Sequence, residues 1–208
     1  MEIKSLSHTS PDELFEAFEQ AFADYEVQLN KAEHLTMLKR RGFNPKASFG
    51  AFDRDKLVSF TCNGIGNFYG VRAAYDTGTG TLKDYQGRGL ATQVFEYSIP
   101  YLRELGIEEY LLEVLQHNTG ALSVYRKLGF EITREFYYFK QKNEQVDRAV
   151  KALDCCYTLK SIKISEYSSI HKFWDFEPSW QNSFEAINNT LKDFICLGIF
   201  LESKLVGY

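Results

Sequence analysis

The residues best suited to chemistry form a short glycine-rich turn, Gln86-Gly87-Arg88-Gly89-Leu90-Ala91, directly before a segment that reads as a helix. The amino terminus of a helix exposes backbone N–H groups that lack a partner within the helix, and it carries a partial positive charge. Such an end binds phosphate when small residues let the ligand approach the backbone. Two glycines and an alanine at alternate positions meet that need, and Arg88 adds a cation. The turn therefore predicts an anion-binding site.

Two common phosphate motifs do not describe this turn. It is not a Walker loop, because no Gly-Lys-Ser/Thr follows the glycines. It is a poor dinucleotide fingerprint as well, since no third glycine follows Gly87 and Gly89 at the required spacing. An ordinary tight entrance to a helix would use similar residues, so the turn alone leaves its ligand open.

A second segment indicates which ligand the glycine turn binds. The apolar run "LLEVLQ" is followed by "HNTGALSVYRKLGF", where Asn118 can cap a helix that ends at Gly129. Together with "QGRGLA", this segment resembles the acetyl-CoA-binding core of the GNAT superfamily of N-acetyltransferases, over roughly residues 1–140. The positions that carry the resemblance are Gln86, Gly89, Ala91, Asn118, Ala121, Tyr125, Gly129 and Phe130.

The resemblance implies a mixed α/β (α+β) fold with a mostly antiparallel sheet, splayed central parallel strands and flanking helices. Acetyl-CoA would lie between the strand that ends at Thr81-Leu82 and the strand that contains Glu113. Its pyrophosphate would rest on the N–H groups of residues 86–91. Gly78 and Gly80 would form a bulge that turns an N–H toward the thioester carbonyl.

The implied activity is direct transfer of acetyl from acetyl-CoA to a small-molecule or peptide primary amine in a ternary complex. The resemblance assigns the general acid to Tyr125, although an aromatic residue on a helix face can equally pack in a core. It assigns the base to Glu113, whose burial in an apolar strand would raise its pKa. A strand-end glutamate bonded to backbone is the alternative.

Other polar side chains compete for these roles. His117, Tyr137 or Tyr138 could act as the base through water, and the roles of Glu33 and His34 stay open. The alternative to an enzyme is a non-catalytic acyl-CoA-binding or protein-interaction module on the same fold.

The elements that would position these residues follow the order β-α-α-β-β-β-α-β-α-β. Capping patterns predict helices that begin after Ser10 and Asn30, each with a glutamate three residues later. The other expected elements are a hairpin turning at 53–55, a strand over 68–82, a helix over 89–106, a strand over 108–116, a helix over 118–129 and a strand over 130–140.

The chain also predicts its own division: a first domain over 1–140, a linker over 141–157, and the incomplete start of a second GNAT-like unit over 158–208. "SFGAFDRDKLVSF" (48–60) aligns without gaps on "CLGIFLESKLVGY" (196–208), which indicates a tandem protein whose natural chain is longer. The aromatic segment "HKFWDFEPSWQNSFEAI" reads as a helical core face or as a loop packed on the first domain, rather than a ligand platform.

Composition sets outer limits. The 208 residues are 44% hydrophobic and 25% charged, as in an ordinary globular protein, and a net charge of −4 argues against nucleic-acid binding. No long apolar run or signal peptide is visible, so we expect no membrane span and a cytoplasmic location. The four cysteines lack metal-binding spacing, so we expect reduced thiols and no metal. Family members often pair, which makes a homodimer an open expectation.

Overall fold

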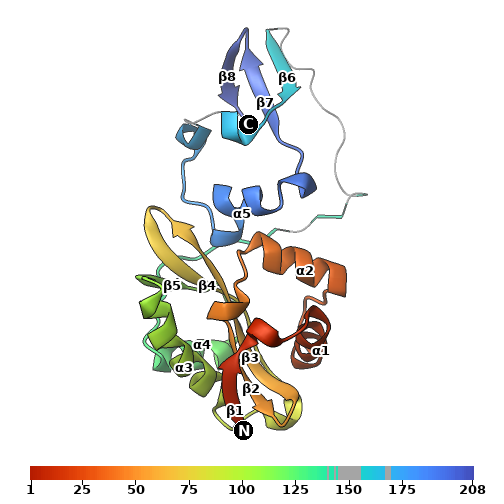
Figure 1. Cartoon of the computed structure of the whole chain (residues 1–208). Helices are drawn as coiled ribbons and strands as arrows, with labels where there is room; N and C mark the ends of the chain where they lie inside the picture. The colour runs from red at the N-terminus through yellow and green to blue at the C-terminus, as the bar shows by residue number, and fades with distance from the viewer. Residues whose placement is uncertain (140, 143, 145–155, 167–169) are drawn as a thin grey trace. The chain divides into compact units, whose positions relative to one another are not determined.

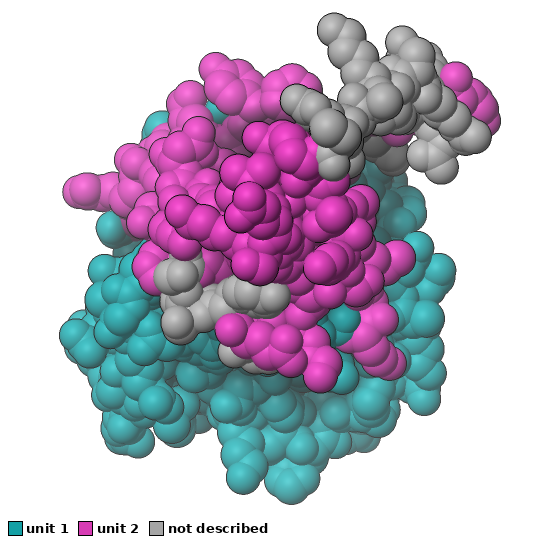
Figure 2. Space-filling model, turned by 90° about the horizontal axis from the view of Figure 1, so that it is seen from above, with its two compact units in different colours: residues 1–129, 178–191 teal, residues 130–177, 192–208 magenta. Residues whose placement is uncertain are grey.

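The computed structural model describes residues 1–139, 141–142, 144, 156–166 and 170–208. They form two compact units, coloured separately in Figure 2: unit 1 contains residues 1–129 and 178–191, and unit 2 contains residues 130–177 and 192–208. This division differs from the expected boundaries at 140 and 158, because residues 178–191 pack into unit 1. The expected linker, 141–157, lies largely outside the described residues.

Unit 1 is built on a five-stranded sheet in the order β1-β2-β3-β4-β5 (Figure 1). Neighbouring strands are antiparallel except β4 and β5, which are parallel. The expected mixed, mostly antiparallel α/β fold is therefore confirmed. The strands are β1 (Glu2–Ser5), β2 (Phe49–Asp53), β3 (Lys56–Phe68), β4 (Val71–Thr81) and β5 (Glu109–Leu111).

Helices flank this sheet, with α1 packed on β3 and β4 and α3 packed on β2 and β3. They are α1 (Pro11–Ala21), α2 (Lys31–Arg40), α3 (Leu90–Glu104), α4 (Thr119–Lys127) and α5 (Phe184–Asn189), with short 3-10 turns at Leu6–His8, Pro45–Ala47, Lys83–Tyr85 and Trp180–Asn182. The two predicted capping boxes are confirmed. Ser10 Oγ accepts from the Glu13 N–H at 3.2 Å, and Glu13 Oε2 accepts from the Ser10 N–H at 2.8 Å. Asn30 and Glu33 do the same for α2.

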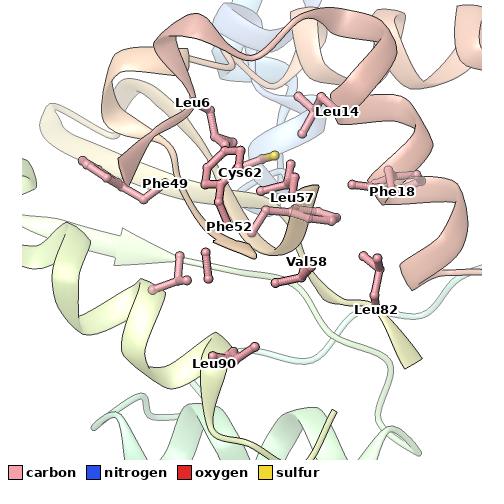
Figure 3. Packing of buried hydrophobic residues seen from close by; sticks show 14 of the residues in the cluster. Leu6, Leu14, Phe18, Phe49, Phe52, Leu57, Val58, Cys62, Leu82 and Leu90 are labelled. Carbon is pink, nitrogen blue, oxygen red and sulfur yellow. The ribbon is translucent and has the colours of Figure 1, made fainter. Parts of the chain in front are cut away.

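The main core of unit 1 lies between the sheet and these helices. Figure 3 shows Leu14 and Phe18 of α1 and Leu90 of α3 turned toward buried side chains of β2 and β3, among them Phe52 and Val58. Leu90 is the first residue of α3, so the core anchors the helix that directly follows the glycine turn.

Three sequence predictions need correction. The strand expected over 68–82 begins at Val71, because a turn at Tyr69–Gly70 closes a hairpin with β3. The strand expected over 108–116 has ladder partners only at Glu109–Leu111. Residues 130–139 form no strand, and Tyr137, Tyr138 and Phe139 are 86 to 88% exposed. A strand needs a partner for its backbone N–H and C=O groups, and no described strand pairs with this segment.

Unit 2 contains a three-stranded antiparallel sheet made of β6 (Tyr157–Ser161), β7 (Leu197–Leu201) and β8 (Lys204–Gly207). It also has 3-10 turns at Ile164–Glu166 and Ile170–Phe173, and a third turn, Leu191–Asp193, begins at the last residue of unit 1 and ends in unit 2. Its β7–β8 hairpin is the one that the sequence aligns with β2–β3. The turns match: Arg54 and its counterpart Glu202 both have φ of 56°, a left-handed conformation that is uncommon for such residues.

The two hairpins also share their register. Each ladder shifts just before its turn, between Ala51 and Phe52 in β2 and between Ile199 and Phe200 in β7, which are aligned positions. The hairpin of unit 2 therefore repeats that of unit 1 in fold as well as in sequence. That the natural chain continues as a tandem protein stays a prediction.

In the described part of the chain, no helix is long and apolar enough to cross a bilayer.

A histidine lies in the core of unit 1 with both ring nitrogens buried. His34 is fully buried, and neither of its ring nitrogens has a hydrogen-bond partner among the described residues. Its ring centroid lies 4.2 Å from that of Phe18 and 5.6 Å from that of Phe15. Burial lowers the pKa of His34 to about 4, because a charged imidazolium would lose its hydration there.

We predict that His34 makes the fold acid-sensitive. A histidine whose pKa is lowered by folding contributes stability that is complete above its unfolded pKa of about 6.5 and is lost as the pH falls toward 4. His34→Leu should therefore reduce the loss in unfolding free energy between pH 7 and pH 4.5 by up to about 3 kcal/mol. Denaturant titrations at several pH values measure this, with the exposed His8→Leu as control. Equal pH dependence in wild type and His34→Leu would contradict it.

Candidate functional site

The site begins where β4 and β5 part. Their parallel pairing runs from Ala73 opposite Glu109 to Tyr75 opposite Leu111, and β5 then ends. β4 continues to Thr81, so residues 76–81 have no partner on that side among the described strands. This leaves a stretch of backbone beside which an extended ligand can lie.

A buried carboxylate lies at the first residue beyond the pairing. Asp76 is 6% exposed, and the β3–β4 ladder shifts beside it so that Thr77 is left unpaired as a bulge. Asp76 Oδ1 accepts from the Gly78 N–H at 2.9 Å, and Oδ2 accepts from the Thr79 hydroxyl at 2.7 Å. Burial raises the pKa of Asp76, and these hydrogen bonds oppose the rise because they favour the ionised form.

Tyr125 completes this carboxylate's shell. Its hydroxyl donates to Asp76 Oδ2 at 2.8 Å from helix α4. Burial raises the pKa of Tyr125, and the nearby charge of Asp76 raises it further, so the phenol keeps its proton at neutral pH. The helix is oriented by the expected cap, since Asn118 Oδ1 accepts from the Ala121 N–H at 3.1 Å, and it closes at Gly129, where φ is 89°.

The bulge corrects one detail of the expected site. It is centred on Thr77, beside Gly78, whereas Gly80 stays in register opposite Phe60. The Gly78 N–H donates to the Asp76 carboxylate, so this N–H is already engaged within β4. The same carboxylate thus holds both the N–H expected to meet a thioester oxygen and the hydroxyl expected to act as an acid.

The glycine turn has the conformation that its residues predict. Gly87 and Gly89 have φ of 73° and 72°, which only glycine adopts without strain. Gly89 is the N-cap of α3, so no side chain caps this helix, and its first turn carries no acidic residue. Its exposed N–H groups suit an anion.

The longer side chains of the turn fold back onto it. Gln86 Nε2 donates to the Thr81 carbonyl at 3.1 Å, and Arg88 Nη2 donates to the Asp84 carbonyl at 2.8 Å. Leu82 is buried and links the end of β4 to β3 through a 2.9 Å bond from its N–H to the Val58 carbonyl. The turn is therefore shaped by its own contacts.

Glu113 does not sit where the sequence places it. It lies two residues beyond the end of β5 and is exposed, so the expected burial within a strand is wrong. Its Oε2 instead accepts from Gln181 Nε2 at 3.1 Å. The pairing that would bury it ends at Leu111.

The other candidate bases also have defined places. His117 Nε2 lies 2.9 Å from Glu26 Oε1 at the surface, while Glu33 caps α2 and His34 is buried beside Phe18. Tyr137 and Tyr138 are exposed residues of unit 2. The structure therefore brings Tyr125 to the open edge of β4 and leaves Tyr137 and Tyr138 in a separate unit.

Sequence reasoning missed Asp76, Arg41 and Gln181. A single acidic residue in the otherwise uncharged segment "AAYDTGTGT" is a usable signal for Asp76, because a carboxylate is seldom buried without a specific reason. Gln181 carried no such signal, since its neighbours in space come from distant parts of the chain. Trp180 does pack on unit 1, as one of the two sequence interpretations of this segment predicts. Among the described residues, no group of three His, Cys, Asp or Glu side chains could hold a metal ion.

Comparisons with known proteins agree on one family. Residues 11–130 match the model of the Acetyltransferase (GNAT) family. The chain is 32% identical over 95 residues to N-alpha-acetyltransferase MAK3 of Arabidopsis thaliana, which covers 46% of this chain and 50% of that protein. This chain therefore spans about half the length of that curated relative.

Solved structures share the fold. The aminoglycoside acetyltransferase meta-AAC0020, from an uncultured soil metagenomic sample, aligns with a TM-score of 0.54 at 21% identity over 68% of this chain and 96% of that chain. The NatC complex bound to Gag peptide and CoA aligns with a TM-score of 0.54 at 21% identity, over 64% of this chain and 87% of that chain.

We predict that Asp76→Asn and Asp76→Ala separate the roles of this side chain. The asparagine can accept from the Gly78 N–H and donate to the hydroxyls of Thr79 and Tyr125, without a buried charge. The alanine leaves buried donors without an acceptor. Asp76→Ala should therefore be less stable than Asp76→Asn by about 1–3 kcal/mol at pH 7, measured by denaturant unfolding. Equal stability of the two variants would show that the carboxylate does not organise the site.

Proposed function

The chain belongs to the GNAT acetyltransferase family, and on that basis we propose that unit 1 transfers the acetyl group of acetyl-CoA to a primary amine. The observation that carries this proposal is the Tyr125 hydroxyl, held 2.8 Å from Asp76 at the point where β4 loses its parallel partner. A proton donor is thereby fixed beside the only stretch of β4 that a thioester could line, among the strands that the structure describes.

In this proposal acetyl-CoA is held by β4, by the glycine turn and by α4. The pantetheine amides pair with the open edge of β4 as far as Thr81, and the pyrophosphate binds the N–H groups between Gln86 and Ala91. A hollow of about 360 Å³ along α4 is lined in part by Arg126 and Lys127, whose charges suit further phosphate. Asn118, the N-cap of α4, and Ala121 in its first turn complete the proposed cosubstrate contacts.

In the proposed reaction one acetyl group moves from sulfur to nitrogen, one proton leaves the amine and one proton is given to the thiolate. The amine nitrogen attacks the thioester carbonyl, so a C–N bond forms and the C–S bond breaks. Glu113 takes the proton that the nitrogen loses, and Tyr125 gives its proton to the departing thiolate. Glu113 suits the base because its carboxylate is exposed to an incoming amine, and Tyr125 suits the acid because its raised pKa keeps the proton on the phenol.

One observation favours the alternative function, a non-catalytic acyl-CoA-binding module. Asp76 engages both Tyr125 and the Gly78 N–H, which are the two groups expected to handle the thioester. If that arrangement persisted with acetyl-CoA bound, the protein would hold the cosubstrate without reaction.

Two solved structures of the same fold support a proposal for the acceptor class. The NatC complex was solved with a Gag peptide and CoA, and meta-AAC0020 is an aminoglycoside acetyltransferase. We propose a primary amine of either kind as the acceptor. A panel of peptides with free amino termini, aminoglycosides, polyamines and amino acids, assayed for CoA release, would identify it.

We predict that CoA raises the thermal midpoint of the protein and that Tyr125→Phe separates binding from turnover. The phenylalanine keeps the ring but removes the proton donor, so CoA should still stabilise the variant while kcat falls about 100-fold or more. Calorimetric titration with CoA and CoA-release assays with the best amine of the panel measure the two effects.

Two outcomes would contradict this prediction in different ways. Equal turnover in wild type and Tyr125→Phe would remove the acid assignment. A wild-type protein that binds CoA but acetylates no amine in the panel would favour the non-catalytic module, and one that does not bind CoA would end both proposals.

A further inference from the structure

Unit 1 takes its last elements from a distant part of the chain. Residues 178–191 belong to it although residues 130–177 separate them from Gly129. Trp180 fixes this segment: it is 6% exposed, and its ring is parallel to that of Tyr75 within 7°, with centroids 5.2 Å apart. Its indole N–H donates to the Arg41 carbonyl at 3.0 Å. Tyr75 is the last residue of β4 that pairs with β5, so the segment is anchored where the two strands part.

The next residue, Gln181, makes two hydrogen bonds of opposite sense. Its Oε1 accepts from Arg41 Nη2 at 2.8 Å, and its Nε2 donates to Glu113 Oε2 at 3.1 Å. The partners dictate this orientation of the amide, because a guanidinium only donates and a carboxylate only accepts. Gln181 thus joins a cation that follows α2 to an anion that follows β5.

Arg41 extends this connection to the bulge. Its Nη1 donates to the Thr77 carbonyl at 3.1 Å, next to Asp76. A continuous path therefore runs from the β4 bulge through Arg41 and Gln181 to Glu113 beyond the end of β5. It spans the two strands at the place where the acetyl group would lie.

We propose that Gln181 is a positioning residue that holds the Glu113 carboxylate at the acceptor side of the site. Residues 178–191 would then take part in amine selection. The inference rests on the proposed function, because it deepens the role of Glu113 as the base. An exposed glutamate samples several rotamers, and a fixed donor restricts it to one in which the carboxylate can reach an amine.

Arg41 and Tyr75 are ionisable groups near the Glu113 carboxylate. Arg41 is linked to Glu113 by the two hydrogen bonds of Gln181, and the side chain of Tyr75, a residue of β4, lies beside the Glu113 carboxylate. Loss of the Gln181 N–H removes a donor that favours the ionised carboxylate. Glu113 should then hold its proton to higher pH.

The main test compares Gln181→Leu with wild type. We expect kcat/KM for the best amine of the panel to fall about tenfold or more, with KM for acetyl-CoA unchanged. The acid limb of the pH–rate profile should move to higher pH. Asn182→Leu is the matched control, because it removes the amide oxygen that accepts a hydrogen bond from Arg40 in the same turn, and Asn182 has no hydrogen bond to Glu113 in the described structure. It should keep the wild-type profile.

A second variant and a second readout keep the test decisive. Gln181→Glu retains the side-chain length and places a like charge against Glu113, so its acid limb should move further in the same direction. Titration of the Glu113 carboxyl by carbon-13 NMR in the free protein should show the same shifts without any turnover. Unchanged titration in both variants would overturn the positioning role, and so would a loss of stability alone. Absence of turnover in wild type would instead end the proposed function, while the NMR comparison still decides the role of Gln181.

Discussion

The organisation of unit 1 depends on a carboxylate that is kept away from water. An isolated buried charge is strongly unfavourable, so Asp76 can lie inside β4 only if donors surround it. Those donors come from three places: the bulged backbone at Gly78, the hydroxyl of Thr79 and the phenol of Tyr125 on α4. One side chain therefore bonds both to the bulged backbone of β4 and to the helix α4.

Local patterns predicted the parts of this structure whose causes are local. The caps at Ser10, Asn30 and Asn118 act within three residues, and the left-handed turn at Gly87 and Gly89 needs nothing beyond the glycines. The family resemblance added the mixed sheet and placed Tyr125 near the end of the β4–β5 pairing. The predictions that failed depended on distant partners: residues 130–139 pair with none of the described strands, and β5 stops at Leu111 where its pairing stops.

The β2–β3 and β7–β8 hairpins share packing contacts at the positions where their sequences align. A Cβ on Gly50 would lie 2.3 Å from Leu57 Cδ1, and one on Gly198 would lie 2.8 Å from Leu205 Cδ1. A leucine of the neighbouring strand therefore fills the space beside both glycines. Lys4 over Phe52 and Lys160 over Phe200 repeat a further contact, with 4.5 and 5.4 Å from nitrogen to ring centroid. The alignment of the two segments thus has a physical basis in each sheet.

The discontinuous make-up of unit 1 has a consequence for its biosynthesis. A ribosome releases the chain from the amino terminus, and domains generally fold as they emerge. The sheet and helices of residues 1–129 can assemble early, but Tyr75 and Phe68 remain uncovered until Trp180 has been translated. During that interval an aromatic surface is open to chaperones or to aggregation. The nascent chain matures only after a stretch of unit 2 has already left the exit tunnel.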